Sequence, residues 1–351
     1  MKRIRWTYGT WVVALLMLLP VACDAPMDDN TGTADDAILF YVKQQVVEGA
    51  ASRTIVDDTD DLVDQGLPIY VYDEQNHFTA GTEVPYYGNG VWRKDGLKWQ
   101  DSEYVLYAYV KSAGTGSGTN LTIFGNGQTV GITQPDAYSN DPGAWADYLL
   151  SYRIAADGAD RPLVQLELER VTAAVELYVS FQSSTAHAAR VTGITFSGVK
   201  YAGTMTLSRH ATPSDQPMED TGMRNVWGCQ PSGAVASYTY GTKTAPIEVK
   251  GFDGTGEKYD VKYRVMRFLT IPQNLTSDNT LQIDYQVQQT ADDDSWESYS
   301  ATFDLSQFAP GEWTIGHKTR YRLNIDTSVQ LEGIVEKWNT TSYIEGTFLP
   351  D

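Results

Sequence analysis

Residues 164–181 read VQLELERVTAAVELYVSF, and this stretch decides the fold class. Apolar and polar side chains alternate strictly over residues 164–169, and the alternation returns over residues 175–181. A period of two places successive side chains on opposite faces of a β-strand. The same pattern recurs at residues 281–288 and 321–326. Each strand then has one apolar and one polar face, as antiparallel sheets packed in a sandwich require.

Turn-forming residues separate the predicted strands. Glycine beside asparagine or aspartate occurs at positions 88–90, 94–96 and 253–254, and such pairs favour tight turns between strands. Helical periodicity is weak, and only residues 144–154 could form a short helix; a turn followed by a strand fits them nearly as well. We therefore expect an all-β fold.

The length of the chain predicts two domains. It has 351 residues, and domains usually hold roughly 100 to 200. The division is expected between the strands that meet at Arg170 and Val171. It gives an N-terminal β-sandwich over residues 54–170 and a C-terminal β-sandwich over residues 171–351, with polar, exposed loops at residues 57–64 and 208–221.

Composition excludes several classes of function. The 26 Lys and Arg are outnumbered by 45 Asp and Glu, for a net charge of -19. No basic stripe is present to follow a phosphate backbone, so nucleic-acid binding is not expected. The four histidines and two cysteines have no ligand-like spacing, and we expect neither a metal site nor a cofactor.

No motif predicts catalysis. A nucleophile elbow of the Gly-x-Ser-x-Gly type is not found, and no local pattern singles out two carboxylates for glycoside hydrolysis. The run Asp292-Asp293-Asp294 could bind calcium, but it lacks the spaced acids and central glycine of an EF-hand loop, and a solvated hairpin tip is favoured. The chain is predicted not to be an enzyme.

Aromatic residues make up 12% of the chain and have two interpretations. They could stack on sugar rings, which would make the protein a monomeric surface lipoprotein that binds glycans. Alternatively, they fill sandwich cores and cross-strand pairs, which is the favoured reading. The residues concerned are Tyr86, Tyr87, Trp92, Trp99, Tyr104, Tyr107 and Tyr109.

The N-terminus has the layout of a secretory signal. Residues 1–22 hold a basic start and a short apolar run, and they end before Cys23. Residues 19–23 resemble a bacterial lipobox, which implies that Cys23 is acylated and anchors the exported protein in the outer membrane. Ordinary cleavage that leaves a free thiol is the alternative. Cys229 then has no partner, and we expect it to be buried without a disulfide.

Several short phrases follow one another in the order found in the fimbrillin family of Bacteroidales, the Mfa-like pilus subunits. After the lipobox come residues 51–55, 66–72, 90–92, 104–109 and 164–179, then 269–273, 281–285, 313–316, 321–325 and 335–338. The order spans nearly the whole chain. The resemblance implies two tandem transthyretin-like antiparallel β-sandwich domains, and a structural subunit of a cell-surface pilus or a fimbria-like adhesin.

The family resemblance also implies maturation by cleavage. An apolar-rich strand lies within the stretch 23–53, which would be a propeptide, and it would complete a sheet of the first domain. A trypsin-like protease would cut between Arg53 and Thr54, release this strand and expose an unpaired edge; alternatively, Arg53 is an ordinary surface arginine. The apolar positions of the strand are Ile38, Leu39, Phe40, Tyr41, Val42, Val46 and Val47.

A strand from a neighbouring subunit would fill that edge. By the same resemblance the donor is the segment 334–350, and subunits joined head-to-tail in this way form an open fibre, the fimbrium, on the cell surface. This segment is less regularly apolar than an ideal donor, so a tip, anchor or accessory subunit is an alternative to a stalk subunit. The tentative donor residues are Ile334, Val335, Trp338, Tyr343, Ile344 and Phe348.

Overall fold

The computed structural model describes most of the chain from Asp36 onward, and its regular structure is almost entirely β-strand. The described residues are 36–42, 68–79, 81–111, 120–124, 129–151, 154–166, 168–182, 186–207, 227–249, 251, 259–290, 295–308, 311–325, 329–337 and 343–344. Their helices are four 3-10 turns: η1 (Pro142–Ala144), η2 (Gly158–Asp160), η3 (Val261–Tyr263) and η4 (Leu305–Gln307). None of them is long and apolar enough to cross a membrane. Asp36–Asp351 form one compact unit.

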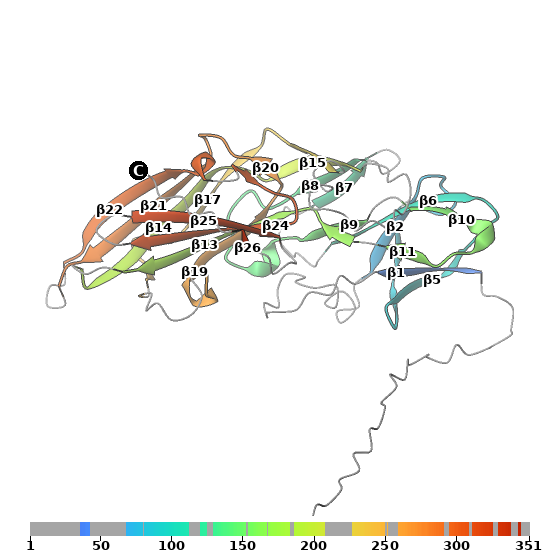
Figure 1. The fold of residues 1–351 in the computed structure, drawn as a ribbon, viewed down its shortest axis with the longest axis horizontal. Coiled ribbons are helices and arrows are strands. Elements are labelled where there is room, and N and C mark those ends of the chain that lie inside the picture. The colour runs from blue at the N-terminus through green and yellow to red at the C-terminus, as the bar shows by residue number, and fades with distance from the viewer. Residues whose placement is uncertain are drawn as a thin grey trace, which may run out of the picture. The chain divides into compact units, whose positions relative to one another are not determined.

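Two sheets form the first sandwich (Figure 1). The β1 sheet has the spatial order β11 (Val164–Leu166), β1 (Ala37–Val42), β5 (Val91–Lys98) and β4 (Tyr86–Gly88). The β6 sheet has the order β12 (Leu168–Arg170), β9 (Tyr148–Ser151), β6 (Glu103–Lys111), β2 (Ile69–Asp73) and β3 (Thr82–Val84), and β10 (Ile154–Asp157) also pairs with β6. Side chains from both sheets, such as Phe40 and Leu106, share one apolar core.

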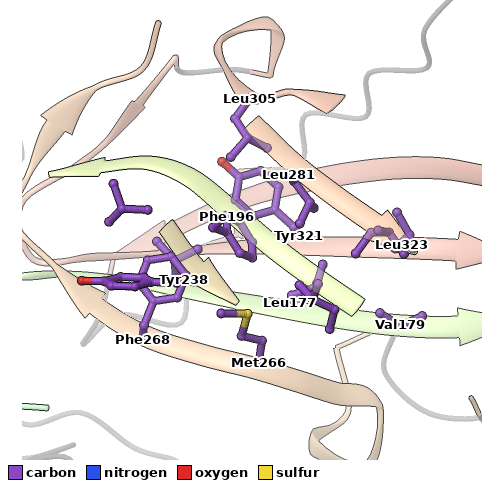
Figure 2. Close-up of a cluster of buried hydrophobic side chains, with 14 of the residues drawn as sticks. Leu177, Val179, Phe196, Tyr238, Met266, Phe268, Leu281, Leu305, Tyr321 and Leu323 are labelled. Atoms are coloured by element: carbon purple, nitrogen blue, oxygen red, sulfur yellow. The ribbon is translucent and has the colours of Figure 1, made fainter. Parts of the chain in front are cut away.

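Two further sheets form the second sandwich. The β13 sheet has the order β19 (Arg264–Thr270), β13 (Ala173–Phe181), β24 (His317–Ile325), β25 (Val329–Lys337) and β26 (Tyr343–Ile344). The β14 sheet has the order β17 (Val235–Tyr240), β14 (Ala188–Lys200), β21 (Thr280–Gln288) and β22 (Glu297–Asp304), and β18 (Ile247–Glu248) pairs with β14. Figure 2 shows Leu177, Phe196 and Phe268 meeting in the core between these sheets. The predicted all-β sandwich architecture is confirmed.

A fifth sheet combines strands from both sides of residue 170. It has the order β16 (Trp227–Pro231), β15 (Ala202–Leu207), β8 (Thr129–Thr133) and β7 (Asn120–Phe124). β20 (Gln273–Asn274) and β23 (Glu312–Trp313) pair only with each other and form a separate two-stranded sheet. Val130 from β8 and Met205 from β15 belong to a third apolar core. Because β8 pairs with β15, the division at residue 170 stays a prediction.

The stretch 164–181 holds three strands where the alternation predicted two. β11 pairs with β1, whereas β12 pairs with β9 in the opposite sheet of the sandwich. The chain therefore crosses from one sheet to the other in the middle of the predicted strand 164–169. The sequence does not show this break, because Val164, Leu166 and Leu168 keep their period of two and all three contribute to the same core.

The strand β13 also differs from the prediction. It was expected to have a polar, solvent-facing side, but eight of its nine residues are buried. β13 is an internal strand of its sheet, antiparallel to β19 and parallel to β24. The only other parallel pair among the described strands is β1 with β11, so the predicted antiparallel sheets contain two parallel ladders.

A buried carboxylate explains how β13 keeps a charged residue. Glu176 lies between arginines of both neighbouring strands, with Oε1 3.2 Å from Nη1 of Arg264 and 3.3 Å from Nε of Arg267, and Oε2 3.1 Å from Nε of Arg320. The Tyr178 hydroxyl donates to Oε2 over 2.8 Å. Burial raises the pKa of the Glu176 carboxyl, but the positive charges of Arg267 and Arg320 outweigh it and hold the pKa at about 2.

A second buried ion pair lies where the two predicted domains meet. Arg170 Nε is 2.6 Å from Asp147 Oδ2, and the Thr172 hydroxyl donates to Oδ1 over 3.0 Å. Asp147 follows η1 and precedes β9, so the expected helix over residues 144–154 is in fact a 3-10 turn followed by strands. The alternative of a turn and a strand was correct.

Replacing Glu176 tests the central charge cluster. We expect Glu176→Gln to lower the free energy of unfolding at pH 7 by about 3 kcal/mol, because it leaves partly buried guanidinium groups without their carboxylate. The folded pKa lies below the ordinary value of 4.5. The contribution is therefore present above pH 4.5 and is lost as pH falls toward 2, so the two proteins should converge in acid.

Urea denaturation between pH 3 and pH 8 measures this difference, with pH values chosen on both sides of the ordinary carboxyl pKa of about 4.5. Asp95→Asn is the matched control, since Asp95 is 98% exposed and 3.9 Å from Arg93. It should change stability by less than about 0.5 kcal/mol. A loss for Glu176→Gln no larger than that of the control would contradict the assigned role.

Candidate functional site

The strand β1 is inserted between two strands that come much later in the chain. It runs antiparallel to β5, where Phe40 lies opposite Trp92, and parallel to β11, where Phe40 lies opposite Val164. Figure 1 shows β1 beside β5 and β11. The ladder is extended by the Trp99 N–H, which donates to the Asp36 carbonyl oxygen over 2.8 Å. The first part of the strand expected before Arg53 is therefore an internal strand of its sheet.

The side chains of β1 alternate between core and surface. Ile38 and Phe40 are both 0% exposed and belong to the core of the first sandwich. Leu39 is half-buried, and Tyr41 is 37% exposed on the other face. Fully burying a large apolar side chain is worth about 1.5–3 kcal/mol. The two inward residues thus close a core that would be open without them.

The exposed face of β1 has its own contacts. A Cβ at Gly90 would lie 3.0 Å from Cε2 of Tyr41, and Gly90 has a φ of +75°. The turn between β4 and β5 therefore requires glycine both for its backbone conformation and for the Tyr41 ring. At the other end, Arg161 Nη1 is 2.7 Å from Asp36 Oδ1, an exposed pair that adds little stability.

Several predicted site residues cannot be placed. The lipidation site, the cleavage site, the end of the propeptide strand and part of the donor segment lie outside the described residues. These are Cys23, Arg53, Thr54, Val46, Val47, Trp338 and Phe348. The acidic run Asp292–Asp294 also lies outside them, between β21 and β22, which form a hairpin.

The remaining donor residues lie in the β13 sheet. Ile334 and Val335 are part of β25, which pairs with β24 from Val329 to Lys337. Tyr343 and Ile344 form β26, which folds back onto the end of β25. The structure therefore places the described donor positions in the chain's own sheet, and it does not bring them near β1 in any strand pairing of the described residues.

Most of the aromatic residues considered for glycan binding are in the core. Burial is nearly complete for Trp92, Trp99, Tyr104 and Tyr107. Tyr109 stacks against Tyr70 with ring centroids 5.0 Å apart, and Tyr86 packs against Trp92. Tyr87 is the exception at 69% exposure, beneath the guanidinium of Arg93. The arrangement favours a role for these aromatic residues in the core, because a single exposed ring does not form a row of rings on which sugars could stack.

The structure also assembles a hydrogen-bonded serine, histidine and aspartate that the sequence did not indicate. Nδ1 of His77 is 2.7 Å from Oδ2 of Asp73, and Nε2 is 2.9 Å from Oγ of Ser102. The spacing of Asp73 and His77 by four residues was visible in the sequence, but Ser102 comes from the turn between β5 and β6. These distances match those of a catalytic triad.

The surroundings of Ser102 assign it a structural role. Its backbone N–H, which an oxyanion hole would use, donates to the Gln100 carbonyl over 2.8 Å, and its carbonyl accepts from the Gly158 N–H over 2.8 Å. The His77 ring packs on Tyr104, with centroids 4.2 Å apart. The three side chains thus connect the end of β2 to the β5–β6 turn.

The other possible ligand sites among the described residues are less well supported. Among the described residues, no group of three or more His, Cys, Asp or Glu is placed to hold a metal ion. A cavity of about 170 Å³ lies between Tyr138, Trp145 and β19, which is smaller than the roughly 300–1,000 Å³ typical of ligand sites. Burial raises the pKa of Tyr138 there to about 12. The buried strand β1 is therefore the strongest candidate functional site.

Truncating one inward residue of β1 should show how much the strand stabilises the sandwich. We expect Phe40→Ala to lower the free energy of unfolding by about 3–4 kcal/mol through lost burial and a cavity. Tyr41→Ala, on the neighbouring but exposed position, should cost about 1 kcal/mol or less. Urea denaturation of both variants makes the comparison, and equal losses would show that β1 is not anchored through its inward face.

Comparisons with known proteins support the fold. The sequence matches no protein-family model and no curated protein sequence. A fimbrial protein from Bacteroides vulgatus is similar in structure, with a TM-score of 0.50 and 13% identity over 87% of this chain and 100% of its own. A candidate cell adhesion protein from Bacteroides uniformis has a TM-score of 0.47 and 12% identity, over 87% of this chain and 100% of its own. The first of these likenesses shows that the chain shares its fold with a protein named as fimbrial.

Proposed function

We propose that the protein is a structural subunit of a cell-surface pilus, or a fimbria-like adhesin, without enzymatic activity. Its fold is that of a protein named as fimbrial. In this proposal it is exported as a lipoprotein precursor, with Cys23 acylated and holding it in the outer membrane. The residues that would be removed, 1–22 and then 23–53, precede the whole of both sandwiches except for β1.

The observation that carries the proposal is the place of β1. This strand belongs to the stretch 23–53, yet it lies inside a sheet whose other strands all come after residue 85. Ile38 and Phe40 fill the core from that position. A cut after Arg53 would sever the only covalent link between β1 and the rest of the first sandwich.

Loss of β1 would leave a groove with two unpaired edges. The inner edges of β5 and β11 would lose their hydrogen-bonding partner, and the core would open between them. An edge of this kind accepts a strand from another chain. In the proposal a neighbouring subunit supplies that strand in a head-to-tail contact, and the repetition of such contacts extends a fibre.

Limited trypsin digestion of the chain from residue 24 onward tests this proposal. We expect an early cut that creates a new N-terminus at Thr54, followed by dissociation of the fragment that contains β1. Dissociation should expose apolar surface, which raises the fluorescence of the dye ANS. Mass spectrometry identifies the new end, and size-exclusion chromatography shows whether the fragment has left.

The control for the cut carries both Lys43→Gln and Arg53→Gln, which remove the two trypsin sites between β1 and the rest of the first sandwich. This variant should keep its N-terminal fragment and show no rise in ANS fluorescence under the same conditions. The proposal fails if the natural chain is first cut elsewhere, or if the fragment with β1 stays bound after the cut at residue 53 even when excess competing strand is supplied.

A further inference from the structure

The groove that β1 occupies limits which strands can replace β1. The inference drawn from this limit rests on the proposed function. We infer that the replacing strand comes from a different protein, not from the segment 334–350 of a second copy of this chain. It must carry two large apolar side chains two residues apart. Copies of this chain would then sit beside unlike subunits and would not polymerise with one another through that segment.

The demand follows from the positions that β1 fills. Ile38 and Phe40 point to the same face because residues i and i+2 of a strand share a face. Both are fully buried, and Phe40 lies between Trp92 of β5 and Val164 of β11. A replacing strand that runs in the opposite direction must meet the same demand, since the spacing of two residues is the same when read either way.

The segment 334–350 does not meet this demand. Its sequence is IVEKWNTTSYIEGTFLP. The large apolar residues come as the adjacent pairs 334–335, 343–344 and 348–349, with Trp338 alone. Adjacent residues point to opposite faces of a strand. Two positions away from each of them stands a charged residue, a small polar residue, glycine or proline, so neither face can fill both sites of the groove.

The described part of the same segment is already used within the chain. Ile334 and Val335 pair with Arg320 and Thr319 of β24, in a ladder that runs the full length of β25. Ile344 of β26 pairs back onto Val335. Lending these residues to another copy would remove strands from the second sandwich, whereas a strand from a different protein carries no such cost.

Peptide binding to the chain cut at Arg53 tests the inference. Fluorescent peptides of residues 36–47 and 334–350 are titrated, and anisotropy follows binding or exchange with the bound fragment. We expect the 36–47 peptide to bind the cut chain and not the uncut chain. The 334–350 peptide should bind about 30-fold more weakly, because it leaves part of the apolar groove unfilled.

Two matched peptide variants distinguish binding that depends on the spacing of apolar side chains from nonspecific apolar binding. Ile38→Ser with Phe40→Ser in the first peptide should weaken binding about 100-fold, since both buried side chains are lost. Glu345→Ile in the second peptide should strengthen binding about 10-fold, because Tyr343 then has an apolar neighbour two residues away. The cut chain alone should stay monomeric on size-exclusion chromatography.

The possible failures are distinguishable. Binding of the natural 334–350 peptide within about threefold of the 36–47 peptide, or ladders of oligomers from the cut chain alone, would overturn the inference and leave the proposed function standing. Failure of the 36–47 peptide to bind or exchange into the cut chain would overturn both, because no open groove would then exist.

Discussion

The burial of two side chains, Ile38 and Phe40, is the constraint on which the first sandwich depends. They close a core whose other walls come from β2, β5, β6 and β11. A sheet with its central strand missing has lost both hydrogen bonds and apolar cover, so the strand has to be replaced or the core must reorganise. β1 precedes all the other described strands in the sequence.

The second sandwich is built on a different principle. Its internal strand β13 is fixed on one face by the apolar core and on the other by Glu176, which faces arginines of both neighbouring strands. Such a cluster is satisfied only when β19, β13 and β24 are all in register. None of these strands belongs to the stretch 23–53, so the charge cluster does not involve β1.

Much of the fold could be predicted from the sequence, because strand periodicity is local. The alternation at residues 281–288 and 321–325 gave β21 and β24, and the apolar run before Arg53 contains β1. The crossing between β11 and β12, the parallel ladders and the buried face of β13 depend on which strands become neighbours, and alternation is the same in every case. The hydrogen-bonded Ser102, His77 and Asp73 lay in separate segments, so no local pattern could unite them.

The parallel pairing of β1 with β11 has a consequence for the order of folding. Phe40 and Val164 are separated by about 120 residues of chain. Closing so long a loop lowers the conformational entropy of the chain, and this loss is offset only once the contact between the two strands has formed. The pairing of β1 with β5 closes a shorter loop, but the position of β1 is complete only when β11 is also in place. β1 comes first among the described strands, yet we expect its pairing with β11 to be one of the last to form.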